Sequence, residues 1–191
     1  MPAGRAPDGV EGVQWNDSRL GAELRTVTAA ARRRATRDGD RQADTAHLLH
    51  SLLEADLRAR EAVDESAGAA GGGRVARVLG YLAQRSIGYG IAWRGVVEDS
   101  GAGTVLTAVD AAGWSPAATA ALRAAAVLAG ERGAPRADGA DLLAALVSDG
   151  GSRAAQVLRS AGVEPQVLAA RPPRPRGEND SRHRDDGPVA S

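Results

Sequence analysis

The sequence predicts an all-α domain in which two tandem helical repeats pack about a pseudo-twofold axis. Residues 23–53 align without a gap on residues 117–147 at a constant offset of 94, and a fixed internal period indicates a repeated structural unit. Each copy reads as helix, loop and helix, and a single copy cannot bury its own apolar stripe. The identical pairs are Ala30/Ala124, Ala31/Ala125, Ala35/Ala129, Gly39/Gly133, Ala43/Ala137, Asp44/Asp138, Ala46/Ala140, Leu48/Leu142, Leu49/Leu143 and Leu52/Leu146.

The first helix of each repeat is predicted over about 19–37 and about 116–131. Both stretches consist of good helix formers. Ser115 followed by Pro116 is an N-cap with proline at the first helical position. Glycine at the end of each stretch, Gly39 and Gly133, is a typical helix stop.

The second helix of each repeat is expected to begin at a capping aspartate. Asp44 and Asp138 can accept hydrogen bonds from the free amides of the following turn. Matching apolar stripes follow them and form the predicted core. A third, shorter helix is expected around 56–64 and around 152–161, the latter ending at Gly162.

The stretch between the copies breaks this pattern. Residues 68–73 are glycine-rich and indicate a joint, and residues 74–86 have the periodicity of an amphipathic helix. Residues 91–97 and 104–109 are rich in β-branched side chains, which favours a small β-hairpin.

The chain ends differ in composition from its middle. Residues 1–17 hold Gly, Pro, Asp and Asn without apolar periodicity, and residues 171–191 are charged and rich in proline, so both are expected to be disordered. The double-repeat domain is expected over 18–170. It divides into repeat one (18–67), an insert (68–114) and repeat two (115–170).

Composition excludes several function classes. The 24 basic residues are all arginine, so a P-loop lysine and Schiff-base chemistry are ruled out. The chain has no cysteine, which excludes disulfides and thiol chemistry and fits a reducing compartment. It has no transmembrane-length apolar stretch and no signal-peptide apolar run, so the cytoplasm is expected. A net charge of zero argues against a dedicated nucleic-acid binder.

Candidate sites are few. Asp44, His47 and His50 have a spacing that could gather a metal, but we favour a cap for Asp44 and a solvated imidazole, and expect no metal and no cofactor. The arginines at 32–34 and Arg37 are interpreted as a solvated face, because consecutive helical residues cannot all face one ligand. No Gly-x-Ser-x-Gly elbow or catalytic triad spacing is present, so we expect no enzyme activity.

The aromatic residues are concentrated near the insert. Tyr89 and Trp93 lie within it, and aromatic side chains often anchor protein interfaces. They are candidates for contacting a peptide or protein partner. The alternative is that Trp93 and Trp114 pack as core between the repeats.

The repeated unit resembles the Clp N-terminal repeat domain, which precedes the ATPase rings of ClpA-, ClpB- and ClpC-type unfoldases. The resemblance is carried by ADTAHLLHSLL (43–53), SPAATAALRAAAVLAGERG (115–133), DLLAALV (141–147) and AAQVLRSAGV (154–163). Thr45 and His47 match the family's Thr-Glu-His segment. For the ClpC type, the resemblance implies that one glutamate per repeat binds the guanidinium of phosphoarginine. This sequence has Ala46 and Ala140 at those two positions.

The resemblance implies a free-standing recognition domain without the motor. We expect a non-catalytic module that binds protein or peptide segments, with Ala46 and Ala140 in a groove lined by short side chains. It would act as an accessory, an adaptor-binding component or a decoy in a Clp protease or chaperone system. The alternative is a helical DNA-binding or regulatory protein that uses its arginine runs. No membrane partner is expected.

Overall fold

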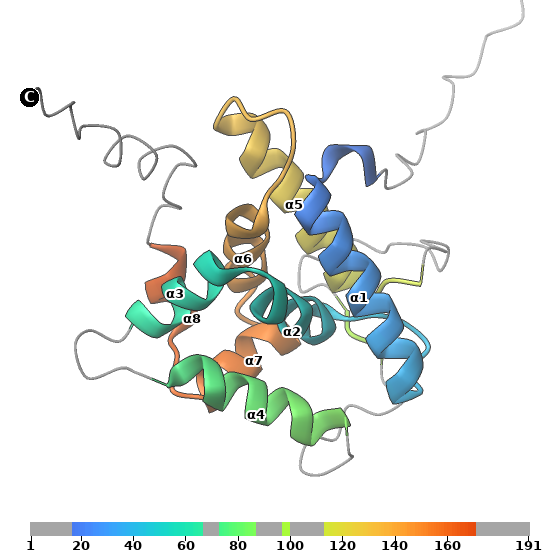
Figure 1. Ribbon diagram of the computed structural model, residues 1–191, viewed down its shortest axis with the longest axis vertical. Coiled ribbons are helices and arrows are strands. Elements are labelled where there is room, and N and C mark those ends of the chain that lie inside the picture. The colour runs from blue at the N-terminus through green and yellow to red at the C-terminus, as the bar shows by residue number, and fades with distance from the viewer. Residues whose placement is uncertain (1–16, 67–72, 87–96, 100–112, 171–191) are drawn as a thin grey trace, which may run out of the picture.

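The computed structural model describes residues 17–66, 73–86, 97–99 and 113–170, and these residues are mostly helical (Figure 1). No strand occurs among them apart from isolated bridges, and the predicted all-α fold is confirmed. The elements are η1 (Asp17–Arg19), α1 (Ala22–Asp38), α2 (Thr45–Ala55), α3 (Leu57–Glu65), α4 (Arg74–Ser86), α5 (Pro116–Glu131), α6 (Gly139–Ser148), α7 (Arg153–Ser160) and α8 (Pro165–Ala169).

The helix ends follow from local sequence. The side chain of Ser115 accepts from the amide of Ala118 at the start of α5, and Asp44 and Asp138 cap α2 and α6. The helices α1 and α5 are each followed by a glycine with positive φ, Gly39 at 77° and Gly133 at 71°. Residues with a side chain rarely adopt this conformation, so glycine stops both helices at equivalent points.

Backbone hydrogen bonds relate the two repeats by the same offset of 94 residues. Gly21 N donates to Ala137 O at 2.8 Å, and the residues 94 positions away reproduce the bond, with Ser115 N donating to Ala43 O at 2.8 Å. The return bonds form a second such pair, from Ala137 N to Arg19 O and from Ala43 N to Gly113 O. Each repeat therefore holds the loop before the other repeat's second helix, which is the pattern of a pseudo-twofold axis.

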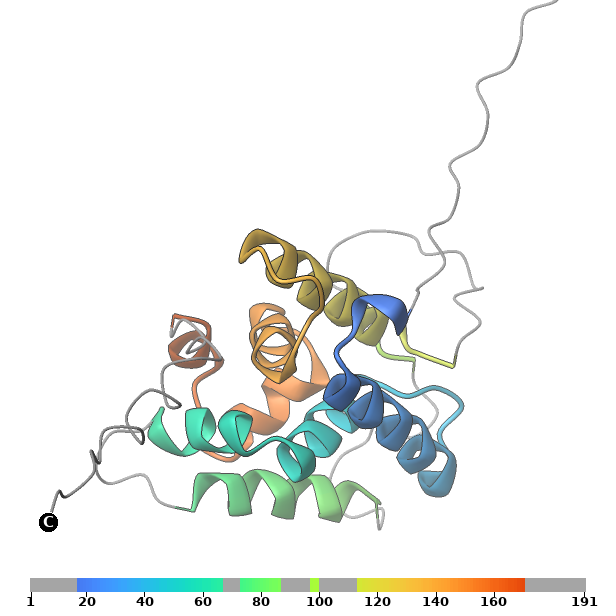
Figure 2. The same cartoon turned by 45° about the horizontal axis from the view of Figure 1, so that its top comes forward.

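The helices α2 and α6 lie at the centre and contact each other (Figures 1 and 2). The third helix of each repeat crosses to the other repeat, so α7 contacts α2 and α3 contacts α6. The apolar stripes of α2 and α6 are almost completely buried, and Trp114 joins them in the core with 2% exposure. Burial of these stripes is the main stabilisation of the fold.

Some elements differ from the sequence-based expectation. The first helix begins at Ala22 because Gly21 is extended, and Gly21 N and Arg19 O bond Ala137 in the loop of repeat two, which leaves η1 as a separate turn. The short helix α8 was not predicted. The β-hairpin expected over 91–97 and 104–109 lies outside the described residues except for Val97, which is not in a strand.

Candidate functional site

Two equivalent seams lie where helices of different repeats begin side by side. We define seam one by the amino ends of α2 and α7 (Asp44, Thr45, Ser152 and Arg153) and seam two by the amino ends of α6 and α3 (Asp138, Gly139, Asp56 and Leu57). Backbone N–H groups at helix starts lack partners within the helix and favour negative charge. The two seams use these groups differently.

Seam one is filled by the side chain of Glu98, which is 6% exposed. Its Oε2 accepts from Thr45 N at 2.9 Å and its Oε1 accepts from Arg153 N at 2.6 Å, so one carboxylate joins the starts of two helices. The hydroxyls of Thr45 and Ser115 lie 2.5 and 3.1 Å from the same carboxylate.

Both hydroxyls are oriented by backbone amides. The Thr45 hydroxyl accepts from Ala154 N at 3.0 Å, and the Ser115 hydroxyl accepts from Ala118 N at 3.1 Å. Each hydroxyl therefore directs its own hydrogen toward Glu98, whose two oxygens receive two donors each. This arrangement satisfies an ionised carboxylate without any proton on it.

Burial raises the pKa of Glu98 above its usual 4.5, and the nearby Asp44 carboxylate raises it further. The hydrogen bonds from Thr45 and from the backbone N–H of Arg153 lower it in opposition. Asp44 itself is paired with Arg153, whose Nη1 lies 2.7 Å from its Oδ2. The site therefore balances a desolvated carboxylate against converging donors.

Seam two is capped by the aspartates that begin its own two helices, Asp138 for α6 and Asp56 for α3. Asp56 caps α3 by accepting from the amides of Arg58 and Ala59 through Oδ1. Its other oxygen points at Gly139, where an added Cβ would lie 1.8 Å from Asp56 Oδ2. Glycine at 139, in place of the threonine of repeat one, leaves room for this position of the Asp56 carboxylate.

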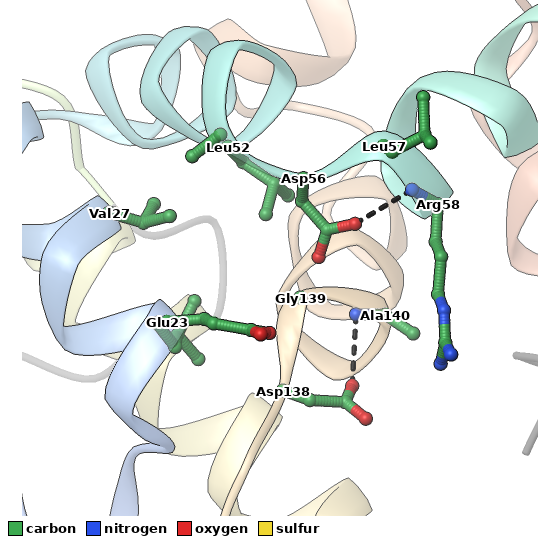
Figure 3. A pocket seen from close by; sticks show the side chains of 11 residues that line it. Glu23, Val27, Leu52, Asp56, Leu57, Arg58, Asp138, Gly139 and Ala140 are labelled. Carbon is green, nitrogen blue, oxygen red and sulfur yellow. Dashed lines mark hydrogen bonds between the residues drawn. The ribbon is translucent and has the colours of Figure 1, made fainter. Parts of the chain in front are cut away.

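A pocket of about 240 Å³ opens at seam two between α1, the α2–α3 junction and α6 (Figure 3). The carboxylates of Glu23, Asp56 and Asp138 stand around its opening, with Arg58 at one edge. Its apolar lining comes from Leu24, Val27, Leu52, Ala55 and Ala140, and Leu57 at the edge is 65% exposed. The pocket suits a ligand that combines an apolar part with a positive charge.

The four residues expected to contact a partner fall in different places. Ala140 lines the seam-two pocket, whereas Ala46 is completely buried and presents no surface in this conformation. Tyr89 and Trp93 lie outside the described residues. Trp114, the other tryptophan weighed as core, is buried and has the guanidinium of Arg32 stacked 4.8 Å from its ring centroid.

The expectation of a solvated imidazole at His47 is wrong, because its side chain is completely buried. Its ring Nδ1 lies 3.1 Å from Asp44 N and completes a capping box for α2. Nδ1 also lies 2.7 Å from Asp44 Oδ1, and Nε2 lies 3.3 and 3.7 Å from carboxylate oxygens of Asp40 and Asp38. The capping role and the carboxylates around the ring account for its burial.

His50 has a different partner from His47. Its Nε2 lies 3.3 Å from Glu54 Oε1, and burial with the nearby Arg34 guanidinium lowers its pKa from 6.5 to about 4. The structure therefore does not bring Asp44, His47 and His50 together. Within the described ranges, His, Asp and Glu side chains form no group of three or more that could hold a metal ion.

The arginine run is only partly a solvated face, which corrects the sequence-based interpretation. Arg33 and Arg37 are exposed, but Arg32 covers Trp114 and Arg34 bonds Glu54 at 2.5 Å. A guanidinium that is stacked or paired in this way is less available to phosphates than a solvated one.

Sequence reasoning missed Glu98 and Asp56. Glu98 lies between the two predicted strands and reads locally as part of a turn, so nothing near it indicates partners more than 50 residues away. The pairing of His47 with nearby carboxylates could have been inferred by comparing the two repeats. At the offset of 94, His47 aligns with Asp141 and Asp38 aligns with Arg132, an exchange of acid and base at two positions.

Comparison with solved structures identifies the class of fold. The chain is similar to the N-terminal domain of the caseinolytic protease associated chaperone ClpD from Arabidopsis thaliana, with a TM-score of 0.53, 18% identity, and coverage of 80% of this chain and 90% of that one. It is also similar to a chain from structural investigations of a malarial protein secretion system, with a TM-score of 0.55, 15% identity and the same coverage. The fold is therefore that of a Clp N-terminal domain.

No family model and no curated protein matches the sequence. Among the described helices, none is both long enough and apolar enough to span a membrane.

Proposed function

We propose that this chain is a non-catalytic module that binds protein segments through the seam-two pocket. The observation that carries the proposal is the pocket itself, where three carboxylates surround an apolar lining beside the exposed Leu57. The place of the pocket supports the proposal, because it opens at the junction of the two repeats of a Clp N-domain fold. Apolar pockets with a few convergent polar groups are common ligand sites.

The partner segment presents an apolar side chain next to an arginine or lysine. Its apolar side chain packs against Val27, Leu52 and Ala140. Its positive charge pairs with Glu23 or Asp56, because Asp138 already lies 3.5 Å from Arg132. Charge-assisted hydrogen bonds to these carboxylates are worth about 1.5–3 kcal/mol each when desolvated. The pocket thereby discriminates against acidic segments, since they would place like charges together.

Binding of short blocked peptides to the full chain tests this proposal. An Ac-Leu-Arg-Leu-NH₂ peptide should bind at least tenfold more tightly than Ac-Leu-Glu-Leu-NH₂, measured by calorimetry at low salt. Glu23→Arg should abolish the preference, whereas Glu131→Arg, an exposed carboxylate on α5 outside the pocket, should preserve it.

A second pair of variants tests the apolar contact with the peptide. Leu57→Ser should weaken peptide binding about tenfold, whereas Val127→Ser, on a helix away from the pocket and 55% exposed, should not change it. Equal binding of both peptides, or equal effects of the pocket and control variants, would contradict the proposal.

In a cell, we infer a role in the cytoplasm as an accessory, adaptor-binding or decoy component of a Clp system. The three roles differ in a reconstituted Clp unfoldase and protease assay. An accessory raises the rate of substrate degradation, whereas a decoy lowers it in an adaptor-dependent reaction and leaves the adaptor-independent reaction unchanged. An adaptor-binding component binds purified adaptor directly. Loss of the effect in Glu23→Arg would assign it to the seam-two pocket, and the absence of any effect would contradict the Clp role.

A further inference from the structure

The Glu98 carboxylate accepts four hydrogen bonds from seam one, as a bound carboxylate ligand would. It reaches seam one from 53 residues beyond Thr45 and 55 residues before Arg153 in sequence. The two neighbours of Glu98 are exposed, Val97 by 59% and Asp99 also at the surface, while Glu98 itself is buried. A single side chain is thus inserted from a surface segment into a polar recess.

The donors in that recess are held in place by groups other than Glu98. The Thr45 hydroxyl is oriented by the amide of Ala154, and the Ser115 hydroxyl by the amide of Ala118. The two N–H donors belong to the first turns of α2 and α7, and both helices are capped independently, by Asp44 and by Ser152. Removal of the Glu98 carboxylate would therefore leave four donors converging on one point.

The recess is also reachable from solvent. A pocket of about 200 Å³ lies against Glu98, and its charged lining consists of Arg41 and Arg153 together with Asp40 and Asp44. The pocket is large enough for a carboxylate group to approach the donors once Glu98 leaves, because one water occupies about 30 Å³.

We propose that seam one is a carboxylate-binding seat with Glu98 as its built-in occupant, and that a glutamate side chain of a partner segment takes the seat by displacing it. The seat binds a carboxylate through the amides of Thr45 and Arg153 and the hydroxyls of Thr45 and Ser115. This proposal is independent of peptide binding at seam two. Seam one is self-occupied, and competition with Glu98 weakens any external acidic ligand.

The test removes the occupant and supplies a carboxylate in solution. Glu98→Ala in the full chain should lower the melting temperature by roughly 5 °C, because four buried donors lose their acceptor. Sodium acetate at 100 mM should recover roughly half of that loss relative to sodium chloride at the same concentration. The recovery should be accompanied by saturable amide shifts at Thr45 and Arg153.

Two controls isolate the seat. Asp99→Ala removes the adjacent, exposed carboxylate and should match the wild type in melting temperature and in its lack of response to acetate. The blocked peptide Ac-Val-Glu-Asp-NH₂, which reproduces residues 97–99, should shift the same amides in Glu98→Ala. Its amide analogue Ac-Val-Gln-Asn-NH₂ should not.

The proposal is overturned if Glu98→Ala melts like Asp99→Ala, if acetate leaves it unchanged, or if the wild type shows the same acetate-dependent shifts. Should Glu98→Ala fail to fold in either salt, the acetate titration of Glu98→Gln decides. Shifts at Thr45 and Arg153 in that variant support the seat, and their absence contradicts it.

Discussion

The two repeats place opposite chemistry at the same structural position. In repeat one, the third residue of helix α2 is His47, which forms a capping box with Asp44. The His47 ring lies near the carboxylates of Asp38 and Asp40. In repeat two, the corresponding residue is Asp141, and its carboxylate receives two bonds from the guanidinium of Arg132 at 3.0 and 2.6 Å. Arg132 occupies the position equivalent to Asp38.

The comparison separates what the fold needs from what it tolerates. Both the imidazole and the carboxylate accept from the N-cap amide, Asp44 N at 3.1 Å and Asp138 N at 3.0 Å, so the cap requires only an acceptor. The charge of the buried group is variable provided that the residue 9 positions earlier has complementary chemistry. A buried group without such a partner would be strongly unfavourable.

The largest expected effect comes from mismatching repeat one. His47→Asp should lower the free energy of unfolding by about 3 kcal/mol, because it places another buried carboxylate beside Asp38, Asp40 and Asp44. Urea denaturation at pH 7 measures the loss. Adding Asp38→Arg should recover about half of it by recreating the pair of repeat two. The neutral acceptor of His47→Asn should cost less than His47→Asp, and equal costs would show that charge is irrelevant here.

Breaking the pair in repeat two should have the next largest effect. Arg132→Ala leaves the 1% exposed Asp141 side chain without its guanidinium partner while the cap bond to Asp138 N remains. We expect a loss of about 2 kcal/mol in urea denaturation, less than for a fully buried pair because Arg132 is one-third exposed. Arg33→Ala, at an exposed position of α1, is the comparison variant, and a loss of similar size there would contradict the assignment.

The seams give a third comparison, Thr45 in repeat one against Gly139 in repeat two. Gly139→Ala forces the Asp56 carboxylate away from α6, so α3 loses its cap and the free energy of unfolding falls by about 1–2 kcal/mol. In Asp56→Ala the clash is absent, and Gly139→Ala should then have almost no further effect. Additive losses in this double-mutant cycle would rule out the proposed contact.

Acid sensitivity should belong to repeat one, because Ala144 replaces His50 in repeat two. The folded-state pKa of His50 is lowered from 6.5 to about 4, so its neutral form stabilises the fold above pH 6.5 and this contribution is lost as pH falls toward 4. The groups acting on the ring are Arg34, Glu54, Asp38 and His47.

The loss should reach at least about 1 kcal/mol, because a pKa difference of one between the folded and unfolded states corresponds to about 1.4 kcal/mol. Thermal unfolding of His50→Gln between pH 7 and pH 4 measures it, since this variant should show a smaller acid-induced decrease than the wild type. An unchanged pH profile would mean that His50 does not contribute.

The fold could be predicted from the sequence because its determinants are local or periodic. The periodic determinant is the offset of 94 between the repeats. The local determinants are helix caps and stops that depend on neighbouring residues: the caps at Asp44, Ser115 and Asp138 and the stops at Gly39 and Gly133. The helix over 74–86 was also predicted at the bounds that the structure shows. The domain boundaries at 18 and 170 stay predictions.

The site could not be predicted in the same way. The contact of Glu98 with Thr45 and Arg153 joins three segments that are distant in sequence, and no local pattern marks it. The acidic opening of the seam-two pocket is likewise assembled from α1, α3 and α6. The burial of His47 depends on Asp38 and Asp40, which only a comparison of the repeats would have indicated.

The central claim is that the two seams have diverged, with seam one closed by Glu98 and seam two open to a basic segment. A titration of the full chain with Ac-Leu-Arg-Leu-NH₂, followed by amide shifts, tests it most directly. We predict saturable shifts at Asp56, Leu57, Gly139 and Ala140, with Thr45 and Arg153 unchanged. Shifts confined to Thr45 and Arg153, or no saturation up to millimolar peptide, would contradict the account.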